Sequence, residues 1–368
     1  MSIYGAQTVD APQFDDAAHE YDAILLMSFG GPEGMDDVMP FLENVTRGRN
    51  IPRERLAEVA EHYHHFGGVS PINGQNRALI AALEEELTQS GLDLPVYFGN
   101  RNWHPLIEDT IRQMRDDGVK RALAFFTSAF SSYSGCRQYR ENIQRAIEAV
   151  GDGAPEIDKI RVFYNHPGFI MSVVDNIHAA LEQFSDDEHG EVHIAFTAHS
   201  IPMGMANNSA YEAQLKEACR IVADVLGTSH YGLVYQSRSG APHIPWLEPD
   251  ILDYMQDLHQ QGISRLVIMP IGFLSDHMEV LFDLDTEAVE KADELGMHMV
   301  RAATVGTAQP FVHMIRDLIV ERMTENPERP VLGILGANHD ICPLNCCLPG
   351  TRPAPQTPAE AVNMENQQ

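Results

Sequence analysis

The feature that most constrains this chain is a regular alternation of short apolar runs with amphipathic helical patterns, from residue 21 to about residue 318. The runs are continuously apolar, which is typical of strands in a parallel sheet covered by helices on both faces. They lie at 23–28, 96–98, 121–127, 160–164, 192–197, 232–236, 266–270 and 299–304. Helical patterns follow most of them, for example at 35–45, 106–114, 168–181 and 277–295. The sequence therefore predicts an α/β fold with parallel sheets.

Two stretches resemble each other and indicate that the pattern occurs twice. Residues 23–30 run into a loop at Pro32, and residues 192–200 run into a loop at Pro202. A length of 368 residues suits two domains of ~150–200 residues each. We predict a first domain at 21–165, completed by a C-terminal helix at 308–340, and a second at 166–307. Residues 1–20 are expected to be flexible, and 349–368, rich in Pro, Asn and Gln, to be disordered.

The charge and the absence of certain segments exclude several classes of protein. There are 25 Lys and Arg residues against 53 Asp and Glu, a net charge of −28, which disfavours nucleic acid and anionic membranes as partners. No stretch approaches the ~20 apolar residues of a membrane span, and the start does not resemble a secretory signal. We therefore expect a cytoplasmic protein without a stable membrane anchor, with a monomer as the default. Gly30, Gly31 and Gly34 lack the spacing of a dinucleotide-binding loop.

Two segments that follow strands carry candidate catalytic or metal-binding residues. His199 comes directly after the strand at 192–197, where an imidazole can act as a base or as a metal ligand. Glu279, Asp283 and Glu287 are spaced four residues apart on the helix at 277–295, with Ser275 or Asp276 as the expected N-cap. A carboxylate stripe beside a cleft suits a cation in transit, although a solvated acidic face is the simpler alternative.

Further loops offer groups that suit a flat, amphipathic ligand bearing carboxylates. Arg47, Arg49, Tyr63 and Ser70 form a basic and hydroxyl-rich set that can bind anions. Ordinary surface charge is the alternative for the two arginines. Two other aromatic and hydroxyl-rich loops contain Ser131 with Tyr133, and Trp246.

Taken together, these segments resemble the ferrochelatase family over residues 21–318. The resemblance rests on Ser-Phe-Gly-Gly-Pro at 28–32, Arg-Gly-Arg at 47–49, the turn at 63–71 and Thr-Ala-His-Ser-Ile-Pro at 197–202. Gln-Ser at 236–237, Pro-Trp-Leu-Glu-Pro-Asp at 245–250 and Gly-Phe-Leu-Ser-Asp-His-Met-Glu at 272–279 complete it. It implies two Rossmann-like domains of the chelatase type, with a porphyrin in the cleft between them.

The resemblance also implies roles for individual residues in the insertion of Fe²⁺ into a porphyrin. His199 would be the catalytic histidine and Glu279 its acidic partner, both binding the substrate Fe²⁺, while Asp283 and Glu287 would continue the path of the metal. Phe29 would face the macrocycle from the opposite side, and no axial ligand is available there. Arg47, Tyr63, Ser70, Ser131, Tyr133 and Trp246 would bind the porphyrin. Whether His199 accepts a proton or carries iron is left open.

The cysteines form a second part of the resemblance. Some ferrochelatases hold a [2Fe–2S] cluster with one internal and three C-terminal cysteines, which here would be Cys136, Cys342, Cys346 and Cys347. The last three lie in a segment at 341–348. Zinc and free thiols are the alternatives, and the adjacent pair leaves open whether both bind. Cys219 lies in a helical pattern and is expected to be core.

The short basic loop around Arg47 bears on which porphyrin is used. Protoporphyrin enzymes of the family carry a longer apolar lip there, so the basic loop favours coproporphyrin III, which has four carboxylates, and coprohaem as product. A coprohaem decarboxylase would then be the downstream partner. The alternatives are a protoporphyrin IX ferrochelatase, a cobalt chelatase and a non-catalytic haem carrier.

Overall fold

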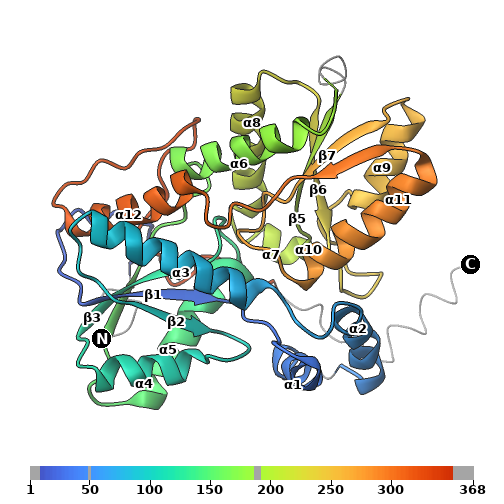
Figure 1. The fold of residues 1–368 in the computed structure, drawn as a ribbon. Helices are drawn as coiled ribbons and strands as arrows, with labels where there is room; N and C mark the ends of the chain where they lie inside the picture. Colours follow the sequence, from blue (N-terminus) through green and yellow to red (C-terminus); the bar gives the residue numbers. More distant parts are fainter. Residues whose placement is uncertain (1–8, 49–50, 186–191, 351–368) are drawn as a thin grey trace, which may run out of the picture.

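The computed structural model describes residues 9–48, 51–185 and 192–350, and its core is built on two parallel sheets of four strands (Figure 1). The first sheet has the order β2-β1-β3-β4, and every pair is parallel. Its strands are β1 (Ala23–Ser28), β2 (Val96–Asn100), β3 (Arg121–Phe126) and β4 (Glu156–Lys159). In β1 all six residues are buried, and alternate side chains enter cores on opposite faces of the sheet.

The second sheet repeats this topology with the order β6-β5-β7-β8. Its strands are β5 (His193–His199), β6 (Tyr231–Gln236), β7 (Arg265–Met269) and β8 (His298–Arg301). In each sheet the first strand in sequence is flanked by the second and third. The expectation of an α/β fold with two similar parallel halves is therefore confirmed.

One predicted strand is wrong. The apolar run at 160–164 was expected to form the fourth strand, but β4 is the preceding segment, which pairs from Arg121↔Glu156 to Ala124↔Lys159. The run itself leaves the sheet and packs into the core through Val162, Phe163 and Tyr164. Burial of its side chains, rather than strand pairing, accounts for its apolar composition.

Helices cover both faces of each sheet. In the first half, α4 (Ile107–Asp116) and α5 (Gln138–Val150) pack on one face, and α3 (Ile72–Gln89) packs on the other. In the second half, α9 (Ile251–Gln260), α10 (Met278–Phe282) and α11 (Ala288–Leu295) cover one face, and α6 (Pro167–Leu181) and α8 (Tyr211–Leu226) the other. Short α7 (Met203–Ala206) follows β5. Cys219 is buried in α8, as predicted for a core residue.

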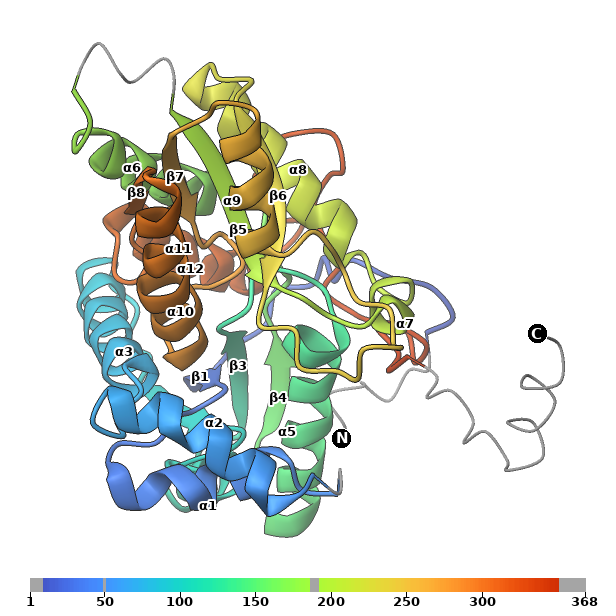
Figure 2. The same cartoon turned by 90° about the vertical axis from the view of Figure 1, so that its right-hand side faces the viewer.

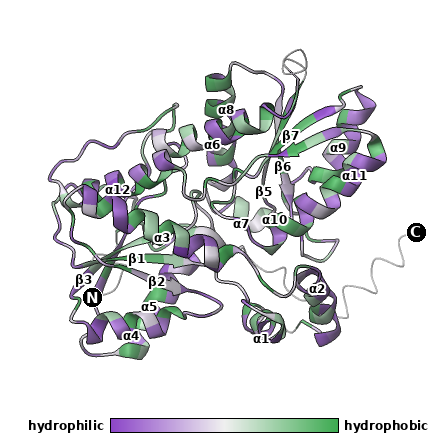
Figure 3. Cartoon of the chain, viewed as in Figure 1, coloured by the Kyte–Doolittle hydropathy of each residue, from purple (hydrophilic) through white to green (hydrophobic). Residues whose placement is uncertain are grey.

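The two halves share one apolar core. Helix α12 (Gln309–Met323) packs against both α3 and α6 (Figures 1 and 2). Side chains from both sheets belong to the same apolar cluster. Colouring by hydropathy shows the strands as mainly apolar, with polar faces on the outer helices (Figure 3). Within the described residues, no helix combines the length and the apolar character needed to cross a bilayer.

The helical pair α1 (Met35–Val45) and α2 (Arg53–His65) projects from the first half and forms a small core of its own (Figure 1). This pair carries Phe41 and Tyr63 to one wall of the site described below. It therefore contributes to the site from outside the two sheets.

The C-terminal helix is shorter than expected. It was predicted within 308–340, but α12 ends at Met323, and Thr324 already has an extended backbone. Asn326, with φ of 49°, and two prolines, Pro327 and Pro330, prevent the helix from continuing. The segment beyond it is fixed instead by buried ion pairs. Asp340 pairs with Arg329 at 3.0 Å, and its Oδ2 accepts a hydrogen bond from the backbone N–H of Asp15 at 3.0 Å.

Candidate functional site

A cavity lies where β1, β3 and β7 end, the position at which ligands bind in open α/β sheets. Its cavity volume is about 150 Å³, within about 650 Å³ of space that includes open solvent. Its walls come from both halves and from the helical pair α1 and α2. The lining includes Phe29, Gly30, Phe41, Tyr63, Ser70, Ile72, Thr127, Tyr139, Gly272, Phe273, Leu274, Ser275, His277, Met278 and Glu279.

Glu279, a lining residue of this cavity, meets a histidine that is not itself among the lining residues. His199, the last residue of β5, places its Nε2 atom 3.5 Å from Oε1 of Glu279, which lies on α10 after β7. The other ring nitrogen, Nδ1, is hydrogen-bonded to the carbonyl oxygen of Ser200. A backbone carbonyl can only accept, so Nδ1 carries the proton, and Nε2 is directed to Glu279. The side chain of His199 is about one-third (33 %) exposed and that of Glu279 about half (47 %), so solvent reaches both groups.

The two groups shift each other's pKa in opposite directions. Burial alone lowers the pKa of His199, but the negative charge and the hydrogen bond of Glu279 outweigh burial and raise it to about 9. Burial alone raises the pKa of Glu279, but the charge of His199 and its hydrogen bond lower it to about 2. At neutral pH the free protein therefore holds an imidazolium beside a carboxylate.

The acidic stripe continues away from this pair. Asp283 follows Glu279 by four residues, and burial, together with the charges of Glu279 and Glu287, raises the pKa of Asp283 to about 7. Its Oδ2 atom accepts hydrogen bonds from Ser237 and from Nε2 of Gln236, the latter at 3.2 Å. The pKa of Glu287 is also raised, mainly by burial. Three carboxylates in mutual electrostatic contact are arranged to attract a cation.

The helix that carries these carboxylates differs from the predicted continuous helix at 277–295. A π-helical turn, Asp283–Glu287, separates α10 from α11. π-turns are frequently found at functional sites because the extra residue per turn redirects side chains. The expected N-cap at Ser275 or Asp276 is also wrong. His277 caps the helix, since its Nδ1 atom accepts a hydrogen bond from the backbone N–H of Glu279 at 3.2 Å.

Two glycines allow close contacts on the cavity wall that is formed by the loop after β1 and the turn before α3. A β-carbon at Gly31 would lie 2.6 Å from the β-carbon of Ser70. Gly68 has φ of 75°, and a β-carbon there would lie 2.6 Å from the backbone of Met35. The loop after β1 and the turn before α3 can therefore meet only because both positions lack side chains.

The predicted ligand-binding residues are only partly brought together. Phe29, Tyr63 and Ser70 line the cavity, and the charge of Glu279 helps to raise the pKa of Tyr63, after the larger effect of burial. Arg47 is exposed at the end of α1 and is not among the lining residues. Arg49 lies outside the described residues.

The other predicted loop residues are engaged elsewhere. Ser131 is buried, and its hydroxyl accepts a hydrogen bond from Gln214 at 3.0 Å. Tyr133 borders a separate surface hollow with Gln138, Glu141, Gln144 and Arg145. Trp246 packs over Gly240, close enough that a β-carbon there would lie 2.2 Å from the indole nitrogen.

Several residues of the site were not predicted. Phe41, Ile72, Tyr139 and Met278 line the cavity, and in the sequence they are indistinguishable from core positions. Arg101 lies 5.5 Å from the ring centre of Phe29 and 4.7 Å from that of Tyr139. Its position directly after β2, at the same sheet edge as the cavity, is the only sequence signal that pointed to it.

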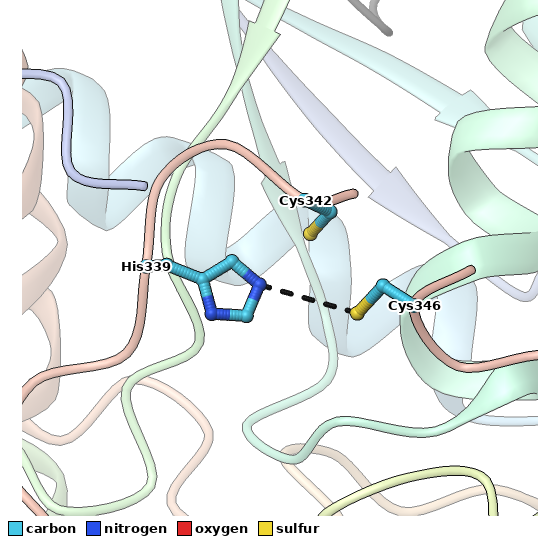
Figure 4. A group of neighbouring side chains, drawn as sticks. All are labelled: His339, Cys342 and Cys346. Atoms are coloured by element: carbon cyan, nitrogen blue, oxygen red, sulfur yellow. Dashed lines mark hydrogen bonds between the residues drawn. The ribbon is translucent and has the colours of Figure 1, made fainter. Parts of the chain in front are cut away.

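Cys136 and the three C-terminal cysteines gather in a second site. The sulfur of Cys342 interacts with those of Cys136 and Cys346, and Cys346 Sγ lies 3.5 Å from Cys347 Sγ. Hydrogen bonds from Cys136 and Cys346 hold the pKa of Cys342 well below the usual thiol value. The imidazole of His339, which the sequence did not single out, joins the group. Its donor atom and those of Cys342 and Cys346 all lie within 4.8 Å of one another (Figure 4). Such a set of soft donors can hold a metal.

Comparison with known proteins agrees with this geometry. The family model described as ferrochelatase matches residues 21–323. A protein of Rhodopirellula baltica named ferrochelatase is 59 % identical over 89 % of this chain and 93 % of its own length. A protein of Streptomyces coelicolor named coproporphyrin III ferrochelatase is 52 % identical over 92 % of this chain and 96 % of its own length.

A likeness among solved structures concerns the fold alone. The sirohydrochlorin chelatase SirB of Bacillus subtilis subspecies spizizenii, solved with cobalt, superimposes with a TM-score of 0.51 at 9 % identity. The match covers 84 % of this chain and 97 % of that one. With the family model matching most of the chain, and relatives more than half identical over nearly their whole length, this chain belongs to the ferrochelatase family.

Proposed function

We propose that this chain inserts Fe²⁺ into coproporphyrin III, giving coprohaem III and releasing two protons, as a step of haem biosynthesis. The observation that carries the proposal is the His199–Glu279 pair, whose carboxylate lines a cavity walled by both halves of the molecule. The relatives of Streptomyces coelicolor and Nocardia farcinica, each at least half identical, are named coproporphyrin III ferrochelatase, which supports the choice of substrate.

His199 and Glu279 are the proposed catalytic residues. Insertion requires that Fe²⁺ loses water ligands and that two pyrrole N–H groups lose their protons. The carboxylate of Glu279 is ionised throughout the neutral range, so it can bind the metal, and Fe²⁺ then competes with the proton of His199. Once that proton has left, the neutral imidazole can bind iron or accept a pyrrole proton at Nε2.

Asp283 and Glu287 are the proposed path of the metal. Asp283 is held by Ser237 and Gln236 at the inner end, while Glu287 is exposed at the outer end. Gradual loss of solvent along the stripe would let the ion exchange water for carboxylate oxygens in steps.

The porphyrin would lie in the cavity between Phe29 and Glu279. Phe29 and Tyr63 offer apolar faces for the macrocycle, and the Ser70 hydroxyl offers a donor at the wall. We propose that Arg47 binds propionates at the rim, where it is exposed. Ser131, Tyr133 and Trp246 remain proposed contacts of the macrocycle edge, which would require the buried Ser131 to exchange its partner Gln214.

We also propose that Cys136, Cys342, Cys346 and Cys347 bind a [2Fe–2S] cluster. Four sulfurs from two distant segments converge, and three of the four residues are buried, which fits a group that needs four thiolates. The hydrogen bond of Cys346 is the main cause that lowers the pKa of Cys347, and the positive charges of Arg140 and Lys159 lower it further and would offset the charge of the thiolates. Such a cluster can take up one electron. Zinc in the same thiolates is the alternative.

The proposed cluster and product bear on the compartment of the protein and on the enzyme that acts after it. Thiols that hold a cluster suit the reducing cytoplasm, where we place the protein. Coprohaem retains its propionates, so we expect an enzyme that decarboxylates them to take the product.

The test is to add Fe²⁺ and either coproporphyrin III or protoporphyrin IX to anaerobically purified protein and to follow the porphyrin absorbance. We expect turnover at least tenfold faster with coproporphyrin III. Equal turnover with both porphyrins would remove the proposed substrate preference, and no insertion into either would overturn the function. Chemical assay of iron and acid-labile sulfide tests the cluster independently of turnover.

A further inference from the structure

We propose that His339 donates a hydrogen bond from its imidazole N–H to the Cys346 thiolate of the metal–sulfur group, and that this bond raises the reduction potential of the group. The inference rests on the proposed cluster. It assigns a role to a residue outside the four thiols and outside the porphyrin cavity.

The first support is the geometry. Nε2 of His339 lies 4.0 Å from Sγ of Cys346, the range of an N–H···S hydrogen bond, and within 4.8 Å of the sulfur of Cys342 (Figure 4). If all four cysteines bind the cluster, the imidazole is not a ligand, and it lies beside the ligands and faces two of their sulfurs. This is the place of an outer hydrogen-bond donor.

The second support is that His339 is fixed from both sides. Its carbonyl oxygen accepts a hydrogen bond from Nζ of Lys159, on β4, at 3.4 Å. The next residue, Asp340, is buried and held by Arg329 and by the backbone of Asp15. Because the backbone is already held, forming the hydrogen bond costs little further backbone entropy.

The third support is the need for donors around the sulfurs. Four thiolates around two ferric ions and two sulfides leave a net charge of about −2, and reduction adds another negative charge. The guanidinium of Arg137 donates to the carbonyl oxygens of Leu344, at 2.5 Å, and Cys346, at 3.0 Å, and to the carboxylate of Glu141, at 2.8 Å, which fixes the loop. The His339 N–H is directed at a sulfur itself, so it stabilises the reduced state more than the oxidised state.

The experiment compares His339→Leu, which lacks an N–H, with His339→Gln, which retains one, in the full-length holoenzyme. The exposed His259 on α9, in the other half of the molecule, provides the matched control His259→Leu. The midpoint potential is measured anaerobically at one fixed pH, together with iron and sulfide content. We expect a more negative potential in His339→Leu with undiminished iron and sulfide, partial recovery in His339→Gln, and no change in His259→Leu.

Each other outcome has a definite meaning. An unchanged potential in a fully loaded His339→Leu protein would overturn the hydrogen bond. Nitrogen hyperfine coupling of a strength that requires a direct Fe–N bond, lost in His339→Leu, would overturn the donor role in favour of a ligand.

If the wild-type protein contains zinc and no sulfide, the proposed cluster fails, and the potential can no longer be measured. The bond to the Cys346 thiolate is then tested by the release of zinc to a chelator. Faster release from His339→Leu than from His339→Gln would support the bond, and equal rates would overturn it. Iron insertion into the porphyrin is assayed separately, so failure of the main function is distinguishable from failure of this bond.

Discussion

His199 and Glu279 approach to 3.5 Å although they are eighty positions apart, one at the end of β5 and the other on the helix after β7. They meet because β5 and β7 are neighbours in the sheet, so that the carboxyl ends of both strands lie at the same edge. The order of the strands therefore assembles the proposed catalytic pair, and substitutions of either residue should affect chemistry far more than folding.

Replacing Glu279 with Gln should lower kcat for iron insertion by roughly 100-fold or more, since an amide neither binds Fe²⁺ as a carboxylate does nor holds the charge of His199. NMR titration should also show a lower pKa for His199. The matched control is Glu290→Gln, an exposed position on α11, which should keep wild-type turnover. A Glu279→Gln enzyme with more than half of the wild-type rate would contradict the assignment.

Replacing Asp283 with Asn should raise the KM for Fe²⁺ by roughly tenfold with little effect on the KM for the porphyrin. The pKa of Asp283 is about 7, so its ionised fraction grows as the pH rises from 6 to 8. The wild-type KM for iron should fall over this interval, and the variant should lose the part of this pH dependence that comes from Asp283. Asp293→Asn on α11 serves as the control. Identical pH dependence in the variant and the wild type would exclude Asp283 from the path.

The stability of the protein should decrease between pH 6.5 and 4 because of His166, which is 4 % exposed. Burial lowers the pKa of His166 to about 4, while its ordinary value is 6.5. Between these values the unfolded chain binds more protons, so stability is present above pH 6.5 and is lost as the pH falls. The loss amounts to as much as ~3 kcal/mol.

The variant His166→Asn tests this assignment. Asn can still cap α6 as His166 does through Nδ1, at 3.1 Å from the Gly168 nitrogen, but it does not titrate. Urea unfolding at several pH values should show a smaller decrease for the variant. Parallel curves for the two proteins would show that His166 does not titrate on unfolding.

Replacing Gly31 with Ala should weaken both stability and porphyrin binding. The added β-carbon would lie 2.6 Å from that of Ser70 and 2.8 Å from a methyl group of Ile72, two residues of the cavity wall. Relief of this contact costs about 1–3 kcal/mol. Gly74→Ala in α3, where nothing lies within 4 Å of the new carbon, should instead be neutral or stabilising. Thermal unfolding and porphyrin fluorescence titration measure both effects, and equal behaviour of the two variants would refute the close contact.

Much of the fold could be predicted because the buried strands are continuously apolar, and β1 was placed at its observed bounds. The fourth strand was misplaced because an edge strand with a polar face, Glu156–Lys159, is followed by a more apolar segment that is buried without being paired. The π-turn after α10 could not be predicted because hydrophobic spacing does not distinguish a single wide turn within a helix.

The candidate site was predictable where its residues follow strands, as His199 and Glu279 do. It was not predictable where contacts join distant parts of the chain. Ser131 looked free to bind a ligand, and its partner Gln214 is eighty-three positions away. His339 was overlooked for the same reason, because only the folded chain places it against Cys346.

The part of the chain matched by the family model ends at Met323, and three of the four cysteines proposed to bind the cluster lie after it. The later segment reaches the body of the protein through the buried Asp340 and contributes every sulfur except that of Cys136. A metal bound by these thiols would therefore act as a cross-link, tying the segment after α12 to the first half of the molecule and restricting the unfolded chain.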